Sequence, residues 1–284
     1  MTLHDYLTKT YSPTSIKGYE NIILRYRKAM GDRAETATYA DVTGYLGMLR
    51  KQNLHPKTLR NNLFGIKIYY RYLIAVGKRK THPCRHLNLK DKINRSVAVE
   101  SLYSPKELED FYQNYQSKDP KNQVRNKVII SLLIYQALSV LEISQIKIRD
   151  VNLEEGILKV SANQKSKGRI LDLKPKQILL FHSYLTVERK QYEREPSEYF
   201  ILNKDGTQLW SGGINRLINS GKSGEKLLPI KIRQSVIAHL LKEKNDVRIV
   251  QEFAGHRRTG STEAYQKTGF EELRIAIDLK HPLQ

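Results

Sequence analysis

The sequence predicts a mainly α-helical protein of two domains, the second of which contains a small antiparallel β-sheet. Apolar residues recur at helical spacing through roughly the first 80 positions. A basic stretch without periodicity follows from Lys78 to Val99, and beyond it helical patterns are interrupted by one strand–turn–strand signal. We therefore predict a helical first domain at residues 1–88, a basic linker at 89–104 and a second domain at 105–284.

Three helices are predicted in the first domain. Ser12 followed by Pro13 is typical of a helix start, and the apolar spacing continues beyond it. A second helix is predicted from Tyr39 to Lys51. After the break at His55-Pro56, a third helix is predicted from Lys57 to Val76, and Gly77 ends it as glycine does just beyond a helix C-terminus.

The second domain is predicted to begin with a capped helix. Ser104 and Glu107 form the Ser-x-x-Glu pattern of a capping box. The segment from Val128 to Leu138 is apolar on nearly every side, which predicts a helix buried at the centre of the domain.

Two strands are predicted around a polar turn, at Ile157–Ser161 and Arg169–Leu173. Helical patterns resume at Lys176 and dominate to the end, apart from a short strand at Tyr199–Leu202. The sheet is thus expected to be small.

Composition excludes several classes of protein. No apolar run approaches the length of a membrane-spanning helix, and the N-terminus has no signal-peptide pattern, so we expect a cytoplasmic protein without membrane attachment. The single cysteine, Cys84, excludes an internal disulfide and a cysteine-based zinc cluster, and we interpret it as a linker residue without a role.

The charge points to a polyanionic partner. The chain has a formal net charge of +20, and residues 50–95 contain 13 basic side chains and one acid, Asp91. A segment of one sign this long suits nucleic acid, with affinity that comes largely from counterion release. On the third predicted helix, Lys57, Arg60 and Lys67 are expected to face the phosphates of double-stranded DNA.

The strongest chemical signal lies between residues 228 and 265. Arg233 falls on the apolar side of a predicted helix, where an arginine is costly unless it meets an anion. Gly255 ends the next helix and presents His256, and Tyr265 follows. Such a trio can bind a phosphodiester, stabilise its transition state and attack it covalently.

Spacing and domain order resemble the tyrosine recombinases, the phage-integrase family with Xer-like members. Twenty-two residues separate Arg233 from His256, and eight separate His256 from Tyr265. The first domain resembles the family's helical, SAM-like core-binding domain. The strand–turn–strand resembles the β-hairpin that carries the family's catalytic lysine, which falls on Lys165, with Lys167 as the alternative.

Two positions depart from the family pattern. The segment Gln136–Ile143 resembles the helix that carries the first arginine, but Ser139 stands at that arginine's position. Ile230 stands where a histidine is expected. Neither side chain supplies a positive charge or a proton. Arg169, beside the hairpin lysines, is either the compensating guanidinium or a surface strand residue.

The resemblance implies site-specific DNA recombination and integration without metal, ATP or other cofactor. Tyr265 is expected to attack the scissile phosphate and form a 3′-phosphotyrosyl bond, with Arg233 and His256 on the non-bridging oxygens. The resemblance also implies a tetramer on DNA, in which the amphipathic segment Phe270–Ile277 docks into a neighbouring protomer. The alternatives are a non-cleaving DNA-binding protein on a degenerate recombinase fold and, less specifically, an RNA-binding helical protein.

Overall fold

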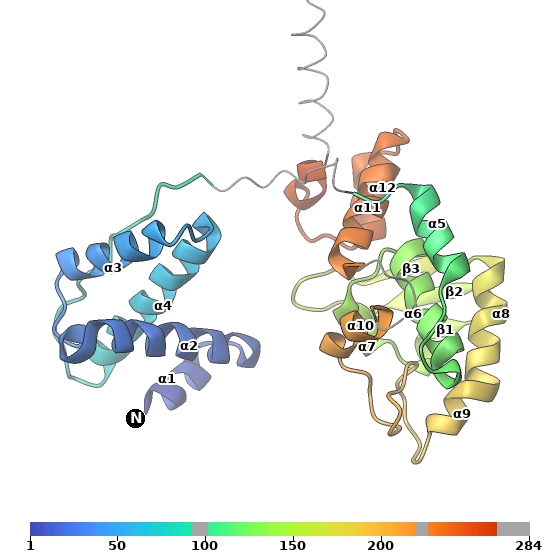
Figure 1. The fold of residues 1–284 in the computed structure, drawn as a ribbon, viewed down its shortest axis with the longest axis horizontal. Coiled ribbons are helices and arrows are strands. Elements are labelled where there is room, and N and C mark those ends of the chain that lie inside the picture. The colour runs from blue at the N-terminus through green and yellow to red at the C-terminus, as the bar shows by residue number, and fades with distance from the viewer. Residues whose placement is uncertain (93–101, 220–226, 266–284) are drawn as a thin grey trace, which may run out of the picture. The chain divides into compact units, whose positions relative to one another are not determined.

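The computed structural model describes residues 1–92, 102–219 and 227–265. The chain divides into two compact units, Met1–Asn94 and Arg95–Gln284 (Figure 1). The first is helical, and the second combines helices with a three-stranded sheet, which confirms the predicted fold class. None of the helices in the described ranges is long and apolar enough to cross a membrane.

The first unit consists of short and medium-length helices joined by tight turns (Figure 1). Its elements in chain order are α1 (Leu3–Thr10), α2 (Pro13–Met30), η1 (Gly31–Ala34), α3 (Tyr39–Lys51) and α4 (Pro56–Ala75).

The predicted helix boundaries of this unit are confirmed to within a residue. α3 has the predicted bounds, and it begins with a capping box formed by Thr38 and Asp41. α4 begins one residue before the predicted start and is ended by Gly77, whose φ of +76° satisfies the left-handed cap.

The core of the first unit is rich in tyrosine. The Tyr26 and Tyr70 hydroxyls lie 2.6 Å apart, and Tyr70 donates to the Ala34 carbonyl, so two buried phenols satisfy each other and the backbone. The interpretation of Cys84 as a linker residue is wrong. Its side chain packs into this core and is 1% exposed, because the chain folds back onto α4 before it leaves the unit.

The second unit surrounds its sheet and one central helix with further helices. Its elements are α5 (Pro105–Asn114), η3 (Pro120–Asn122), α6 (Gln123–Tyr135), α7 (Val140–Gln145), η4 (Ile148–Asp150), β1 (Val151–Asn152), β2 (Ile157–Val160), β3 (Arg169–Asp172), α8 (Pro175–Ser183), η5 (Tyr184–Glu188), α9 (Arg189–Tyr192), α10 (Ser211–Ile218), α11 (Pro229–Lys242) and α12 (Val247–Ala254).

The predicted buried helix is α6, which contacts α5, α8, α10 and α11. Its residues from Val128 to Leu133 have essentially no exposed surface. The prediction that this helix reaches Leu138 is wrong. It ends at Tyr135, and Ala137 adopts a positive φ of 48° that turns the chain toward α7.

The sheet is antiparallel in the order β1-β2-β3. The two predicted strands are confirmed, each one residue shorter, with Val160 opposite Arg169. The predicted strand at Tyr199–Leu202 is wrong, since these residues form only isolated bridges, from Tyr199 to Lys147 and from Leu202 to Gln208.

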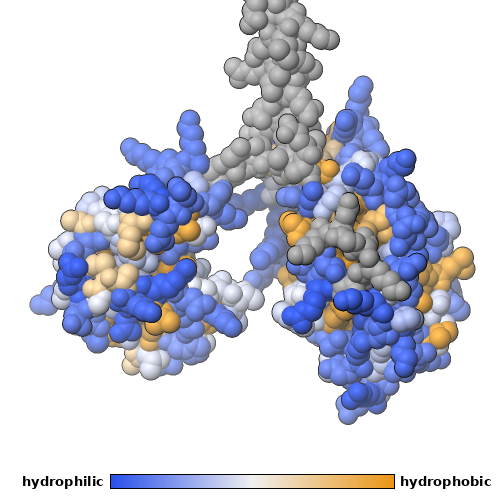
Figure 2. Space-filling view, viewed as in Figure 1, coloured by the Kyte–Doolittle hydropathy of each residue, from blue (hydrophilic) through white to orange (hydrophobic). Residues whose placement is uncertain are grey.

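Hydrophilic residues cover most of the visible surface of each unit, with apolar residues scattered between them (Figure 2). In the first unit, α4 carries Lys57 and Arg60 at exposed positions and Lys67 at a half-buried one.

Gly65 is expected to set the approach of α2 to α4. A Cβ atom at this position would lie 2.5 Å from Cγ2 of Ile22, so the Gly65→Ala variant must push the two helices apart. We expect it to lower the free energy of unfolding by about 1–3 kcal/mol, as overpacking does. Hydrogen exchange of the α2 and α4 amides measures this locally.

The matched control is Gly44→Ala in α3, where an added methyl group meets no atom within 4 Å. It should raise stability by roughly 0.5–1 kcal/mol through helix propensity. Equal stabilisation by both variants would show that α2 and α4 do not meet at Gly65.

Candidate active site

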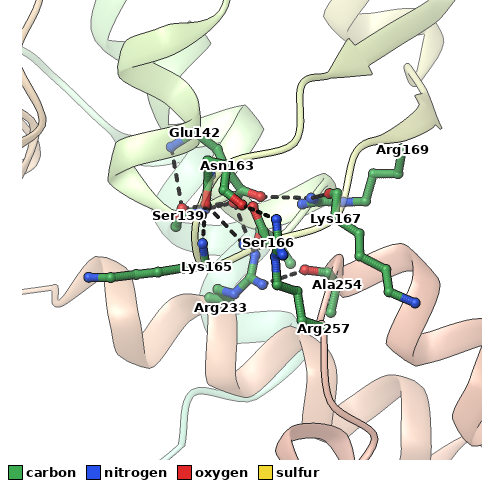
Figure 3. Close-up of polar contacts among 11 residues, drawn as sticks. Ser139, Glu142, Asn163, Lys165, Ser166, Lys167, Arg169, Arg233, Ala254 and Arg257 are labelled. Carbon is green, nitrogen blue, oxygen red and sulfur yellow. Dashed lines mark hydrogen bonds and ion pairs between the residues drawn. The ribbon is translucent and has the colours of Figure 1, made fainter. Parts of the chain in front are cut away.

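Arg233 lies at the junction of three segments of the second unit (Figure 3). It occupies the buried side of α11, and its side chain is 11% exposed. Its NH1 group donates to the carbonyl of Ala137 and lies 3.4 Å from Oε2 of Glu142, while NH2 donates to the carbonyl of Ala254. One guanidinium thus ties α11 to the turn before α7 and to the end of α12.

Glu142 is the carboxylate around which the site is organised. Its Oε2 accepts hydrogen bonds of 2.8 Å from both the backbone N–H and the hydroxyl of Ser139, the N-cap of α7. Its Oε1 pairs with NH1 of Arg169 at 2.7 Å. Burial alone would raise the pKa of Glu142, but the hydrogen bond and charge of Arg169, with the charge of Arg233, lower it to about 2.

Ser139 therefore differs from its predicted setting. The prediction placed it within a helix, but α7 begins at Val140 and Ser139 caps its first turn. The cap is neutral, so the position supplies no cation to the site.

Arg169 is buried, and the interpretation of it as a surface strand residue is wrong. Its side chain is 2% exposed, because it lies on the inward face of β3 together with Leu171. Its Nε and NH2 atoms have no hydrogen-bond partner among the described residues. Two buried guanidinium groups thus share one carboxylate, which leaves one positive charge in excess.

His256 is presented by the end of α12, as predicted. Gly255 has a φ of +67°, and the backbone N–H of His256 donates to the carbonyl of Gln251. The Nδ1 atom lies 2.9 Å from Oγ1 of Thr262. Burial, followed by the charges of Arg233 and Arg169, lowers the pKa of His256 to about 4, so its imidazole is neutral at pH 7.

Tyr265 lies beside His256. It is the last described residue of a helical stretch that begins at residue 260, and its ring is nearly parallel to the imidazole, with an interplanar angle of 11° and a centroid separation of 6.4 Å. Burial raises the pKa of its phenol, which the charge of Arg233 and a hydrogen bond with Gln234 partly oppose. The structure thus brings together Arg233, His256 and Tyr265.

The turn between β2 and β3 docks onto the segment that carries His256. The N–H of Lys167 donates to the carbonyl of Gly255 at 2.9 Å, and Ser166 forms a bridge with His256. The side chains of Lys165 and Lys167 are both exposed and point away from the contacts around Glu142 (Figure 3). Their backbone is fixed at the site, while their ammonium groups make no hydrogen bond or ion pair with any other described residue.

The remaining predicted positions lie outside this cluster. Lys57, Arg60 and Lys67 are on α4 in the first unit. Ile230 is 63% exposed in the first turn of α11, and the predicted tail helix Phe270–Ile277 lies outside the described residues.

Two residues that matter for the site were not singled out from the sequence. Glu142 is the shared partner of Arg169 and Arg233, and its signal was the capping-box spacing from Ser139. Arg257 donates to the carbonyl of Asn163 at 2.6 Å, and its only signal was its place directly after His256.

Comparison with known proteins places both units in one family. Residues 102–272 match the phage integrase family, and residues 3–76 match the phage integrase N-terminal SAM-like domain. Tyrosine recombinase XerC of Chlorobaculum parvum is 25% identical, covering 98% of this chain and 92% of its own. XerC of Oceanobacillus iheyensis is 26% identical, with coverages of 97% and 92%.

Solved structures share the fold. The XerH site-specific recombinase bound to difH substrate, in a pre-cleavage complex, has a TM-score of 0.69 and 18% identity, and the match covers 97% of this chain and 85% of that one. A lambda integrase dimer bound to a COC′ core site has a TM-score of 0.63 and 17% identity, with coverages of 94% and 96%.

An arginine, a histidine and a tyrosine that converge in such a helix-rich domain define the class of tyrosine-type site-specific DNA recombinases. The chain belongs to the phage integrase family. The reading of the chain as an enzyme is confirmed, and a non-cleaving DNA-binding protein is not favoured.

Gly255 is expected to be required for the burial of Arg169. A Cβ atom at Gly255 would lie 2.3 Å from NH1 and 2.9 Å from Cζ of Arg169. The Gly255→Ala variant therefore bears both the cost of a left-handed alanine, about 1–2 kcal/mol, and the displacement of a buried cation. We expect a loss of at least about 3 kcal/mol in denaturant unfolding.

Gly156→Ala provides the control, because Gly156 has the same φ of +67° but its Cβ would meet only Cδ1 of Ile178, at 3.4 Å. The free energy of unfolding of this variant should fall only by the cost of a left-handed alanine, about 1–2 kcal/mol. If the two variants are equally destabilised, the burial of Arg169 does not require a residue without a side chain at position 255.

Proposed function

We propose that this recombinase cuts and rejoins double-stranded DNA through Tyr265, with Arg233 and His256 on the scissile phosphate. The observation that carries the proposal is the convergence of these three side chains beside a buried cluster with one excess positive charge. A site that holds more buried guanidinium than carboxylate favours an anion, and a phosphodiester is the anion that a nucleophilic tyrosine can attack.

The phenol oxygen of Tyr265 attacks phosphorus and releases its proton to solvent, the bond to the 5′-oxygen breaks, and a 3′-phosphotyrosyl bond forms. Arg233 and the neutral His256 donate hydrogen bonds to the non-bridging oxygens, and Lys165, or in the alternative assignment Lys167, protonates the departing 5′-oxygen. Attack of a 5′-hydroxyl from a partner duplex reverses these steps and joins the new strand.

Arg169 is proposed to replace the charge that is missing at Ser139. Its guanidinium pairs with Oε1 of Glu142 while Arg233 approaches Oε2, so the second cation enters the site from β3. Because its atoms are buried, Arg169 acts on the phosphate through its charge and through the carboxylate it shares with Arg233.

The DNA-binding and assembly parts of the proposal rest on the basic segment and on the family. The XerH and lambda integrase structures contain bound DNA, and the family match extends through the first unit. We propose that α4 faces DNA phosphates, that protomers assemble as a tetramer on DNA with exchange of the C-terminal helix, and that the domains divide at residues 1–88, 89–104 and 105–284. A cytoplasmic location belongs to the same proposal.

Loss of the attacking oxygen should abolish cleavage while DNA binding persists. We expect wild-type protein, incubated in EDTA with a nicked duplex that carries its site, to accumulate a covalent protein–DNA complex that survives denaturing electrophoresis. Tyr265→Phe should give none. Tyr199→Phe, which alters a half-buried tyrosine elsewhere in the unit, is the control and should retain the complex.

The same assay tests Arg169. Arg169→Ala should slow formation of the covalent complex strongly, because the site loses one buried positive charge and Glu142 loses its partner. Circular dichroism establishes that the variant is folded. A rate within a few-fold of wild type would show that Arg169 does not replace the missing charge. If the wild-type protein gives no covalent product on a site that it binds tightly, the proposal that it cleaves DNA is wrong.

The basic face of α4 is tested by salt titration of DNA binding. Replacing Lys57, Arg60 and Lys67 by Ala should reduce the slope of log affinity against log salt by up to about 2.7, since each phosphate contact contributes about 0.9. The control replaces the exposed Lys9, Lys17 and Lys28 of α1 and α2. A greater reduction in the control would place the DNA-binding face on those helices.

A further inference from the structure

We propose that Arg257 is a positioning residue that fixes the loop carrying Lys165 against the segment that presents His256. The inference rests on the proposed function, because it gives Lys165 the role of proton donor to the leaving oxygen. It concerns a residue outside the arginine–histidine–tyrosine trio and outside the hairpin.

The first observation is a long-range contact between the two segments. NH2 of Arg257 donates to the carbonyl of Asn163 at 2.6 Å, across 94 positions of sequence. A charged donor makes this a strong hydrogen bond, and the acceptor belongs to the turn between β2 and β3.

The second observation is that Asn163 organises the turn around the lysine. Its Oδ1 accepts from the backbone N–H of Lys165 at 2.8 Å and from that of Ser166 at 2.9 Å. Its own N–H donates to the carbonyl of Ser166 at 3.0 Å. A shift of Asn163 therefore moves the Cα of Lys165, from which the exposed ammonium reaches toward its target.

The third observation is that the turn is held from two sides. On one side the N–H of Lys167 donates to the carbonyl of Gly255. On the other side, Arg257 donates a hydrogen bond to the carbonyl of Asn163. Lys165 lies between the two anchors, so removing the Arg257 anchor leaves the half of the turn that precedes the lysine without this tie to the His256 segment.

If Arg257 positions Lys165, its loss should slow cleavage only through the step in which the leaving oxygen is protonated. Protonation of a departing alkoxide requires a correctly placed acid, whereas a departing thiolate needs no proton. The experiment therefore compares two nicked duplexes with the same site, one with the natural 5′-bridging oxygen and one with sulfur in that place. Single-turnover formation of the covalent complex is measured at saturating protein.

We expect Arg257→Ala to slow cleavage of the oxygen substrate by about 10–100-fold, the scale of a displacement of about 1 Å in a catalytic group. On the sulfur substrate it should cleave at a rate close to wild type. Lys165→Ala should show the same pattern with a larger loss. Arg258→Ala is the matched control, because Arg258 is equally exposed and its side chain makes no hydrogen bond within the described ranges.

Equal slowing on both substrates would overturn the proposal, and so would weaker DNA binding with a smaller salt slope, which would make Arg257 a direct phosphate contact. If sulfur fails to rescue Lys165→Ala, the lysine assignment of the proposed function is wrong. If sulfur rescues Lys165→Ala but not Arg257→Ala, only the positioning role fails.

Discussion

The second unit depends on one buried carboxylate between two arginines. Glu142 would be costly to bury alone, and its pKa of about 2 shows how strongly Arg169 and Arg233 favour its charged form. The three side chains come from α7, β3 and α11. Since breaking such a group leaves an uncompensated charge in the interior, these elements are held in one relative arrangement, and the site inherits that rigidity.

The same cluster contributes to the protonation of its neighbours. Burial, followed by the positive charges of Arg233 and Arg169, lowers the pKa of His256 to about 4, so the imidazole is neutral at pH 7. Burial raises the pKa of Tyr265, and Arg233 opposes it. An arriving phosphate brings negative charge that weakens both effects of the arginines. That negative charge favours the protonated phenol as well, so the phosphate does not by itself release the proton of Tyr265.

Sequence patterns predicted the helix boundaries that depend on local interactions. The α3 bounds, the end of α4 at Gly77 and the left-handed cap at Gly255 depend on capping and on glycine, and each was recovered. The burial of Arg169 was not, because a charged side chain is costly to bury unless it has a partner, and the sequence does not show that partner. The tertiary ion pair with Glu142 makes that burial possible, on the same face of β3 as Leu171. No periodicity of the strand itself encodes a partner that lies 27 residues earlier in the chain.

The departure at Ser139 acquires a physical meaning in this geometry. A serine at the start of α7 caps the helix and donates twice to Oε2 of Glu142, the oxygen that Arg233 also approaches. The other oxygen is left to Arg169, so a guanidinium still enters the cluster, from the strand in place of the helix. The turn that carries Lys165 directly precedes this strand, and its Asn163 carbonyl accepts the hydrogen bond from Arg257. Arg169 and the lysine turn thus belong to one hairpin, which the Lys167 hydrogen bond and the Ser166 bridge hold against Gly255 and His256, so we propose that cleavage depends on the fit of this hairpin.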